Sequence, residues 1–150
     1  MEILLVDDSQ SDLFLHRRTF ERAKILNSIT TATAAGEAIE RLRATDESTS
    51  AGRLLVFIDL IMVPMDGLEL LQQIRAERLA SDSVFVMLSG LSDARLLKQA
   101  YELGAHTFLT KPLDPVALLD LLRSLRRIIA INESTEGFVL MWLGEGGESD

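Results

Sequence analysis

Short, unbroken apolar runs alternate with segments of helical periodicity along this chain, and this alternation constrains its fold more than any other feature. The runs, such as LLVFI at 54–58, are too short for helices. They lack the alternation of polar and apolar residues that marks a half-exposed strand, so they are expected to be covered on both faces. Between them, apolar residues recur at i, i+3, i+4 and i+7, which indicates amphipathic helices. Strands that alternate with helices predict a parallel sheet with helices on both faces.

Five strands and five helices are predicted in this alternation. The strands are expected at 2–6, 27–32, 54–58, 84–88 and 106–109, and the helices at 11–24, 34–44, 67–77, 93–103 and 114–131. The first helix carries its apolar residues at 13, 14, 15, 20 and 23. Residues 1–131 are therefore expected to form one α/β domain built on a doubly wound five-stranded parallel sheet. Residues 132–150 are expected to be a C-terminal tail with one short apolar segment, 138–143.

Charge and composition argue against several classes of function. The formal net charge is -8, and the clearest basic cluster, Arg123, Arg126 and Arg127, is expected to be a solvated helix surface. Because nucleic-acid affinity depends on clustered cations, we expect no nucleic-acid partner. No apolar run approaches the ~20 residues that span a bilayer, and the N-terminus lacks a secretion signal. There is no cysteine and hence no thiolate metal site. We therefore expect a cytoplasmic protein without membrane contact.

Polar residues stand where four of the five predicted strands end. Asp7 and Asp8 follow the first strand, Asp59 the third, Ser89 the fourth and Lys111 the fifth. In an open α/β sheet, ligands bind beyond the carboxyl ends of the strands. Each of these residues alone is explained by a turn or a helix cap. Their shared position at one edge of the sheet predicts a functional site.

Three carboxylates that meet at one edge repel one another, so a cation is expected among them. Mg²⁺ suits the site because it takes hard oxygen ligands and typically binds one or two carboxylates together with phosphate oxygens. With the metal ion and the Lys111 ammonium in place, a carboxylate can act as a nucleophile on phosphorus and form an aspartyl phosphate. The Ser89 hydroxyl could donate to a phosphoryl oxygen.

Four motifs resemble those of response-regulator receiver domains of two-component signalling. They are LLVDDS at 4–9, FIDLIMVPMDG at 57–67, MLSG at 87–90 and FLTKP at 108–112. The resemblance covers residues 1–131 and implies a flavodoxin-like receiver fold with strand order 2-1-3-4-5. The long loop at 45–53 resembles the stand-alone receivers that partner bacterial phytochromes.

The resemblance implies a phosphoacceptor and a metal site. Asp59 would accept the phosphoryl group. Asp8 would bind Mg²⁺ directly and Asp7 through water, together with Asp59 and the backbone carbonyl of Ile61. Such a domain is a bacterial signalling phosphoprotein of a phosphorelay rather than a conventional enzyme. It catalyses its own phosphorylation by a histidine kinase or phosphotransfer protein, and it slowly hydrolyses the product.

The resemblance also implies a switch that senses the phosphoryl group. Lys111 would pair with the phosphoryl group, Ser89 would move to hydrogen-bond it, and Phe108 occupies the aromatic switch position. A cis peptide bond is expected between Lys111 and Pro112, where the preference for trans is only about 0.5–1 kcal/mol.

The sequence departs from the family pattern near the phosphoacceptor. Val63 stands where the family usually has proline, with Pro64 one residue later, and Phe108 lacks a tyrosine hydroxyl. Ile61 and Leu91 are apolar at positions where polar side chains often place the hydrolytic water. We therefore predict slow self-dephosphorylation.

The tail has two interpretations. The apolar segment 138–143 could pack on the domain as an extra element, or it could pair with a partner or a second copy to form a homodimer. The tail is too short for an output domain, so the signal is expected to reach a downstream protein through surfaces around the last two helices and the strand between them.

Two alternatives to a signalling receiver remain. A Mg²⁺-dependent phosphohydrolase of the haloacid dehalogenase type would also form an aspartyl phosphate. Such enzymes carry a second aspartate two residues after the nucleophile, where this chain has Ile61. A pseudo-receiver that only binds a partner is the other alternative, and the complete set of expected site residues argues against it.

Overall fold

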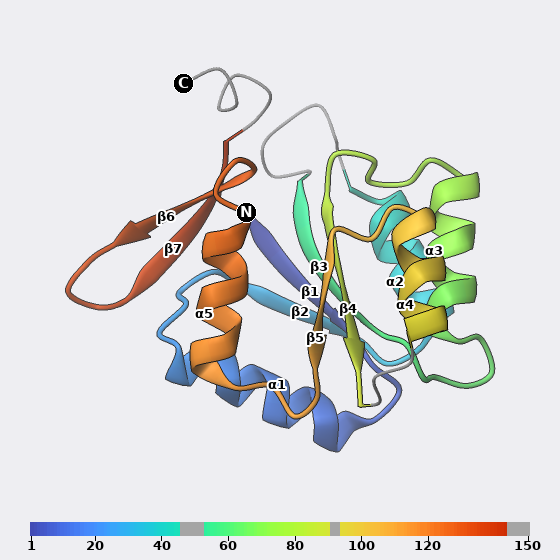
Figure 1. The fold of residues 1–150 in the computed structure, drawn as a ribbon, viewed down its shortest axis with the longest axis horizontal. Helices are drawn as coiled ribbons and strands as arrows, with labels where there is room; N and C mark the ends of the chain where they lie inside the picture. Colours follow the sequence, from blue (N-terminus) through green and yellow to red (C-terminus); the bar gives the residue numbers. More distant parts are fainter. Residues whose placement is uncertain (46–52, 91–93, 144–150) are drawn as a thin grey trace.

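The computed structural model describes residues 1–45, 53–90 and 94–143 and confirms the predicted alternation of strands and helices (Figure 1). The strands are β1 (Glu2–Val6), β2 (Ile29–Ala32), β3 (Leu54–Asp59), β4 (Val84–Ser89) and β5 (Thr107–Thr110). The helices are α1 (Gln10–Arg22), α2 (Ala35–Arg43), α3 (Gly67–Ala76), α4 (Ala94–Glu102) and α5 (Pro115–Ser124). Two further strands follow, β6 (Ile129–Glu133) and β7 (Phe138–Trp142). The loop expected at 45–53 lies almost wholly outside the described residues.

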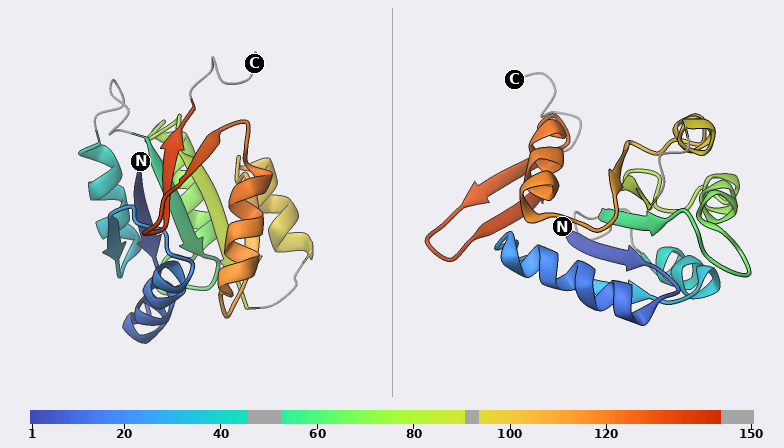
Figure 2. Two further views of the ribbon diagram at one scale, coloured as in Figure 1. Left: turned by 90° about the vertical axis from the view of Figure 1, so that its left-hand side faces the viewer. Right: turned by 60° about the horizontal axis from the view of Figure 1, so that its bottom comes forward.

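The five strands β1 to β5 form a parallel sheet in the order β2-β1-β3-β4-β5, which confirms the predicted fold class. Figures 1 and 2 show α1 and α5 on one face of the sheet and α2, α3 and α4 on the other. Successive residues of β1 and β3 pack on opposite faces. Leu4 and Val56 face α2 to α4, whereas Ile3 and Leu55 face α1 and α5. This two-sided burial explains the unbroken apolar runs.

Three helices begin at side-chain caps that the sequence already contains. Ser9 caps α1, and Asp114 caps α5 with Pro115 in the first turn. Asp66 caps α3 in a capping box with Glu69. These caps fix where each helix starts after the preceding strand. They therefore also fix the short segments that lie at the carboxyl edge of the sheet.

The predicted burial of α1 is partly wrong. Phe14 and Leu15 are exposed, and the stripe that faces the sheet runs through Leu13, His16 and Phe20. These three residues have the spacing i, i+3 and i+7 and therefore share one helical face. The face of α1 that packs on the sheet thus includes a buried histidine in place of one of the expected apolar side chains.

The prediction of a last helix that reaches residue 131 is also wrong. The helix ends at Ser124, and the chain then forms an antiparallel hairpin of β6 and β7. Ile129 pairs with Trp142 and Ile131 with Leu140, so a period of two replaces the helical period. The expected domain boundary at residue 131 falls inside β6.

The hairpin packs on the domain at the amino ends of the strands, beside the N-terminus (Figure 1). Phe138 exchanges backbone hydrogen bonds with Lys24 and Leu26 at 2.7 and 2.8 Å. The Asn27 amide donates to the carbonyls of Met1 and Leu140 and accepts from the Leu140 N–H. The hairpin therefore stands at the far end of the sheet from the residues predicted to be functional.

None of the helices in the described part of the chain combines the length and the apolar character that crossing a bilayer requires.

Candidate functional site

The carboxyl edge of the sheet gathers the predicted site residues. Asp7 follows β1 directly, Asp59 and Ser89 are the last residues of β3 and β4, and Lys111 follows β5. In the parallel register, Asp59 lies opposite Leu88, and Ser89 lies opposite Thr110. Polar side chains from four strands therefore arrive at one place because the strands end together.

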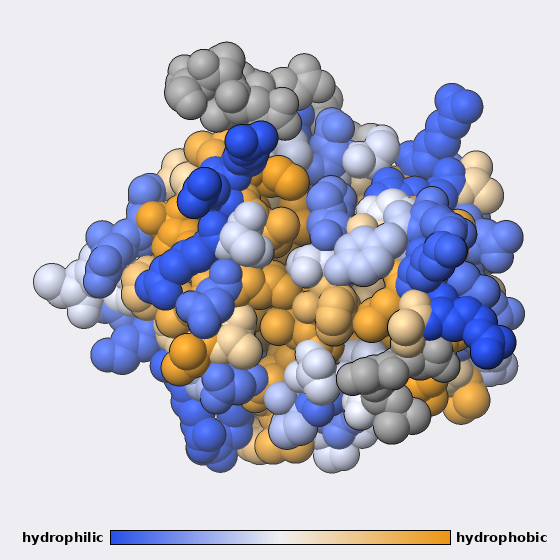
Figure 3. Space-filling view, in the orientation of Figure 1, coloured by the Kyte–Doolittle hydropathy of each residue, from blue (hydrophilic) through white to orange (hydrophobic). Residues whose placement is uncertain are grey.

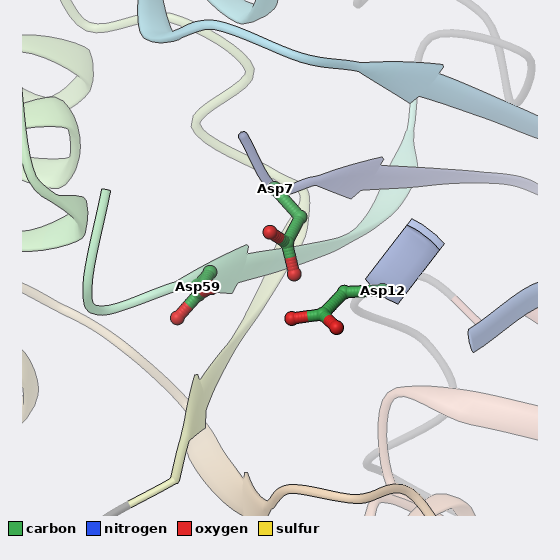
Figure 4. A group of neighbouring side chains, drawn as sticks. All are labelled: Asp7, Asp12 and Asp59. Carbon is green, nitrogen blue, oxygen red and sulfur yellow. The ribbon is translucent and has the colours of Figure 1, made fainter. Parts of the chain in front are cut away.

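Lys111 is the centre of this site. Its ammonium donates to the Oδ2 atoms of Asp12, Asp59 and Asp7 at 2.8, 2.9 and 3.2 Å. Figure 4 shows these three carboxylates turned toward a common space from β1, β3 and the start of α1. Burial lowers the pKa of Lys111, but its hydrogen bonds to Asp12 and Asp59 and the surrounding negative charge outweigh this effect and raise the pKa overall. Lys111 is therefore a permanent cation in the site.

Asp7 is fully buried and held by fixed donors. Its Oδ1 accepts from the Ser9 N–H at 2.9 Å, and its Oδ2 lies 3.2 Å from His16 Nε2. An ionised carboxylate can only accept, so the imidazole nitrogen donates. Burial raises the pKa of Asp7, but the hydrogen bonds from His16 and Ser9 together with the Lys111 charge bring it below the usual value. Asp7 is therefore held in its ionised form.

Asp59 is also buried but has fewer donors. Its Oδ1 accepts from the Ile61 N–H at 3.0 Å, and its Oδ2 accepts from Lys111. Burial raises the pKa of Asp59, the charge of Asp7 raises it further, and the hydrogen bonds from Lys111 and Ile61 only partly oppose this. The pKa values of the two buried carboxylates thus shift in opposite directions, and Asp59 has the more basic oxygens.

Two residues of this site were not among the predicted ones. Asp12 reaches Lys111 from the first turn of α1, and His16 reaches Asp7 one turn later. Their spacing of four residues places both on the helix face that begins beside Asp7. His16 could have been found from the sequence, because it lies in the helical stripe between Leu13 and Phe20, and a buried imidazole needs a polar partner.

The expected direct metal ligand, Asp8, stands apart from the other carboxylates. It is exposed, and its Oδ2 accepts from the Val63 N–H at 3.1 Å in the loop after β3. Ile61 and Val63 in this loop are 61% and 75% exposed. The loop returns close to Asp59 at Gly67, where a Cβ atom would overlap the Asp59 carbonyl oxygen. Asp8 is thus tied to the loop whose Ile61 carbonyl was expected to bind the metal.

The remaining predicted residues lie on the side of β4 and β5. Ser89 is buried, and its backbone carbonyl accepts from the Lys111 N–H at 2.8 Å. Phe108 is partly exposed and makes an edge-to-face contact with Tyr101, with ring centroids 6.5 Å apart. The Lys111–Pro112 peptide bond is cis, as is Val63–Pro64. Leu91 lies outside the described residues.

Two of the expected metal ligands, Asp7 and Asp59, belong to a carboxylate cluster that could hold a divalent cation. Carboxylate oxygens from Asp7, Asp12 and Asp59 lie within 4.8 Å of one another. When these three are ionised, the single Lys111 ammonium leaves two negative charges uncompensated. Oxygen donors with this charge are those that Mg²⁺ prefers.

Fold and site together define the class of this protein. A doubly wound sheet in the order 2-1-3-4-5, with buried aspartates and a lysine at its carboxyl edge, describes a receiver-type domain. A family model for the response regulator receiver domain matches residues 3–123. This chain therefore belongs to the response regulator receiver domain family, the receivers of two-component signal transduction.

Two sequences and one solved structure illustrate the similarity. Probable methanogenesis regulatory protein FilR2 of Methanothrix harundinacea is 34% identical over 113 residues, which are 75% of this chain and 72% of that protein. Probable transcriptional regulator ycf27 of Porphyridium aerugineum is 32% identical over 128 residues, which are 85% of this chain but only 49% of that protein. The structure of the bacteriophytochrome response regulator AtBRR is 28% identical with a TM-score of 0.70, covering 89% of this chain and 97% of that chain.

Proposed function

We propose that this chain is a stand-alone receiver whose Asp59 accepts a phosphoryl group from a histidine kinase or phosphotransfer protein in a Mg²⁺-dependent reaction. The observation that carries the proposal is the contact between the buried Asp59 carboxylate and the Lys111 ammonium, 2.9 Å apart. A raised pKa makes the ionised Asp59 a better nucleophile than an ordinary aspartate. The similarity to AtBRR over most of both chains supports the stand-alone assignment.

In the proposed reaction, an Asp59 oxygen attacks phosphorus. The O–P bond forms as the P–N bond of a phosphohistidine breaks, and the departing imidazole keeps that electron pair and takes up a proton. The Lys111 ammonium and the Ser89 hydroxyl then donate to the phosphoryl oxygens. Asp7, Asp8, Asp59 and the Ile61 carbonyl would hold Mg²⁺, which when bound supplies positive charge that balances the carboxylates and the phosphoryl oxygens.

The proposed output surface lies on α4, β5 and α5. Ala94, Leu97, Tyr101 and Phe108 line a shallow apolar groove there. Figure 3 shows apolar residues gathered near the centre of this face. If Ser89 moves to the phosphoryl group and Phe108 turns inward, the wall of this groove changes. A downstream protein that binds the groove would sense phosphorylation in this way.

A second copy of the chain is a further proposed partner. Val139 and Met141 on β7 and Leu143 directly after it alternate along the outer side of the hairpin and are exposed. Such apolar stripes mark interfaces. Light scattering should give a dimer mass for the wild type and a monomer mass for Met141→Lys. Phe14→Lys, a change at an even more exposed apolar residue on α1, should leave the dimer intact. A monomeric wild type contradicts the proposal.

The phosphoacceptor is tested by incubating the full chain with a small-molecule phosphodonor and Mg²⁺ and measuring the intact mass. We expect the gain of one phosphoryl group in the wild type and none in Asp59→Asn or without Mg²⁺. A stable wild-type adduct also argues against a phosphohydrolase, which would turn over the donor. No adduct under any condition would favour the pseudo-receiver and overturn the proposal.

A further inference from the structure

Asp12 makes the shortest of the three contacts to the Lys111 ammonium, although the proposed phosphotransfer gives it no role. It differs from the other two carboxylates in exposure. The Asp12 side chain is 37% exposed, whereas those of Asp7 and Asp59 are 1% and 6% exposed. Asp12 also lines a cavity of about 570 Å³ that runs along α1 to Lys111 and Leu113. It is therefore the carboxylate that can turn away from Lys111 toward water.

Lys111 has no donor to spare in this arrangement. An ammonium carries three N–H donors, and each of the three carboxylates accepts one hydrogen bond from it. A phosphoryl oxygen can therefore bond to the ammonium only by displacing a carboxylate. Asp59 carries the phosphoryl group and stays in place. Asp7 is buried and is also held by Ser9 and His16.

We propose that Asp12 is a positioning residue that holds the Lys111 ammonium in the unphosphorylated state and yields it to the phosphoryl group. This inference rests on the proposed phosphorylation of Asp59. Because the Asp12 carboxylate competes with phosphoryl oxygens for the same donor and repels them, it weakens the binding of a phosphoryl group. Asp12 thereby biases the domain toward its unphosphorylated state.

The size of the effect follows from the exposure of the pair. A partly exposed ion pair is weaker than a buried one, so Asp12→Asn should strengthen the binding of a phosphoryl mimic by about three- to tenfold. The asparagine keeps an oxygen that can accept from Lys111 but lacks the negative charge. The Ser9 cap is unaffected, because it uses the backbone N–H of residue 12. We therefore expect the variant to fold.

The experiment is a titration of the full chain with beryllofluoride at saturating Mg²⁺, followed by ¹⁹F NMR. Trp142 is a poor reporter, because it lies in the hairpin at the opposite end of the sheet. Asp12→Glu restores the charge and should bind as the wild type does. Asp120→Asn, the same change at an exposed residue of α5 that pairs only loosely with Arg123, is the matched control. It should also bind as the wild type does.

The outcomes separate this inference from the proposed function. Tighter binding in Asp12→Asn alone supports it. The inference is overturned if Asp12→Asn binds no more tightly than Asp120→Asn, or if Asp12→Glu binds as tightly as Asp12→Asn. In either case, wild-type binding that depends on Asp59 leaves the proposed function intact. If the wild type shows no binding beyond that of Asp59→Asn, the proposed function fails and this inference fails with it.

Discussion

His16 Nε2 lies 3.2 Å from Asp7 Oδ2 in a buried contact that joins the second turn of α1 to the end of β1. The contact holds an ionised carboxylate beside Asp59 without direct access to water. The contact also ties α1 to the site, because His16 lies in the helix stripe that packs on the sheet.

Removal of the imidazole should therefore destabilise the fold. His16→Leu keeps an apolar side chain in the stripe but takes a donor from a buried carboxylate, which should lower the free energy of unfolding by about 1–3 kcal/mol. His16→Gln, whose amide can still donate, should recover part of the loss. Urea unfolding followed by circular dichroism measures both variants. A His16→Leu variant as stable as the wild type would contradict a stabilising role for the contact.

The opposite pKa shifts of Asp59 and Asp7 predict opposite pH dependences of stability. Burial raises the pKa of Asp59, so its ionised form opposes folding increasingly as the pH rises from the ordinary aspartate pKa of 3.8 through the folded-state value. Asp59→Asn should therefore gain stability relative to the wild type as the pH rises toward neutral. Asp7 has a lowered pKa, because the hydrogen bonds of its carboxylate outweigh its burial. The wild type should therefore lose stability relative to Asp7→Asn as the pH falls through the folded-state pKa of Asp7.

The measurement is a series of urea unfolding curves for the three proteins from acid to neutral pH, without divalent cations. The two stability differences from the wild type should change with pH in opposite directions. Differences that change in the same direction would contradict one of the two pKa shifts, and the variant whose difference has the unexpected sign would show which one.

Ile61 offers a test of phosphoryl lifetime. Its side chain is exposed beside Asp59, where an amide could place the hydrolytic water, so Ile61→Asn should shorten the lifetime of the phosphorylated protein several-fold. Val63→Asn, the same kind of change at a more exposed residue of the same loop, is the control and should have little effect. Loss of the phosphoryl mass over time after removal of the donor measures the rate. An unchanged or longer lifetime in Ile61→Asn would rule out the predicted cause of slow dephosphorylation.

Asn27 offers a test of the hairpin's attachment. Its side chain bonds both the N–H and the carbonyl of the buried Leu140, so Asn27→Ala leaves two backbone groups without these partners. We expect a loss of about 2–3 kcal/mol in the free energy of unfolding. The fluorescence of Trp142, which stacks near Arg53 with the guanidinium 5.0 Å from the ring centroid, should report hairpin release. Unchanged stability and fluorescence would mean that Asn27 does not hold the hairpin.

Much of the fold was predictable from the local pattern of the sequence. Unbroken apolar runs and helical periods identify the five strands and five helices, because two-sided burial and the helical repeat act over a few residues. The end of α5 was not predictable in this way. Ile128 and Ile129 continue the helical spacing of Leu121, Leu122 and Leu125, but residues 129–133 form β6 and pair with β7. That pairing depends on residues 138–142, which lie outside the segment in which the helical period is read.

For the site, the sequence by itself determined which residues reach the carboxyl edge of the sheet. Asp7, Asp59, Ser89 and Lys111 stand at the ends of parallel strands, and parallel strands end together. Only the tertiary structure decided which of them touch and which other residues join them. The rotation of α1 brings Asp12 to Lys111 and His16 to Asp7, and the loop after β3 draws Asp8 away to Val63. These contacts depend on how separate elements pack, and position along the chain does not encode that packing.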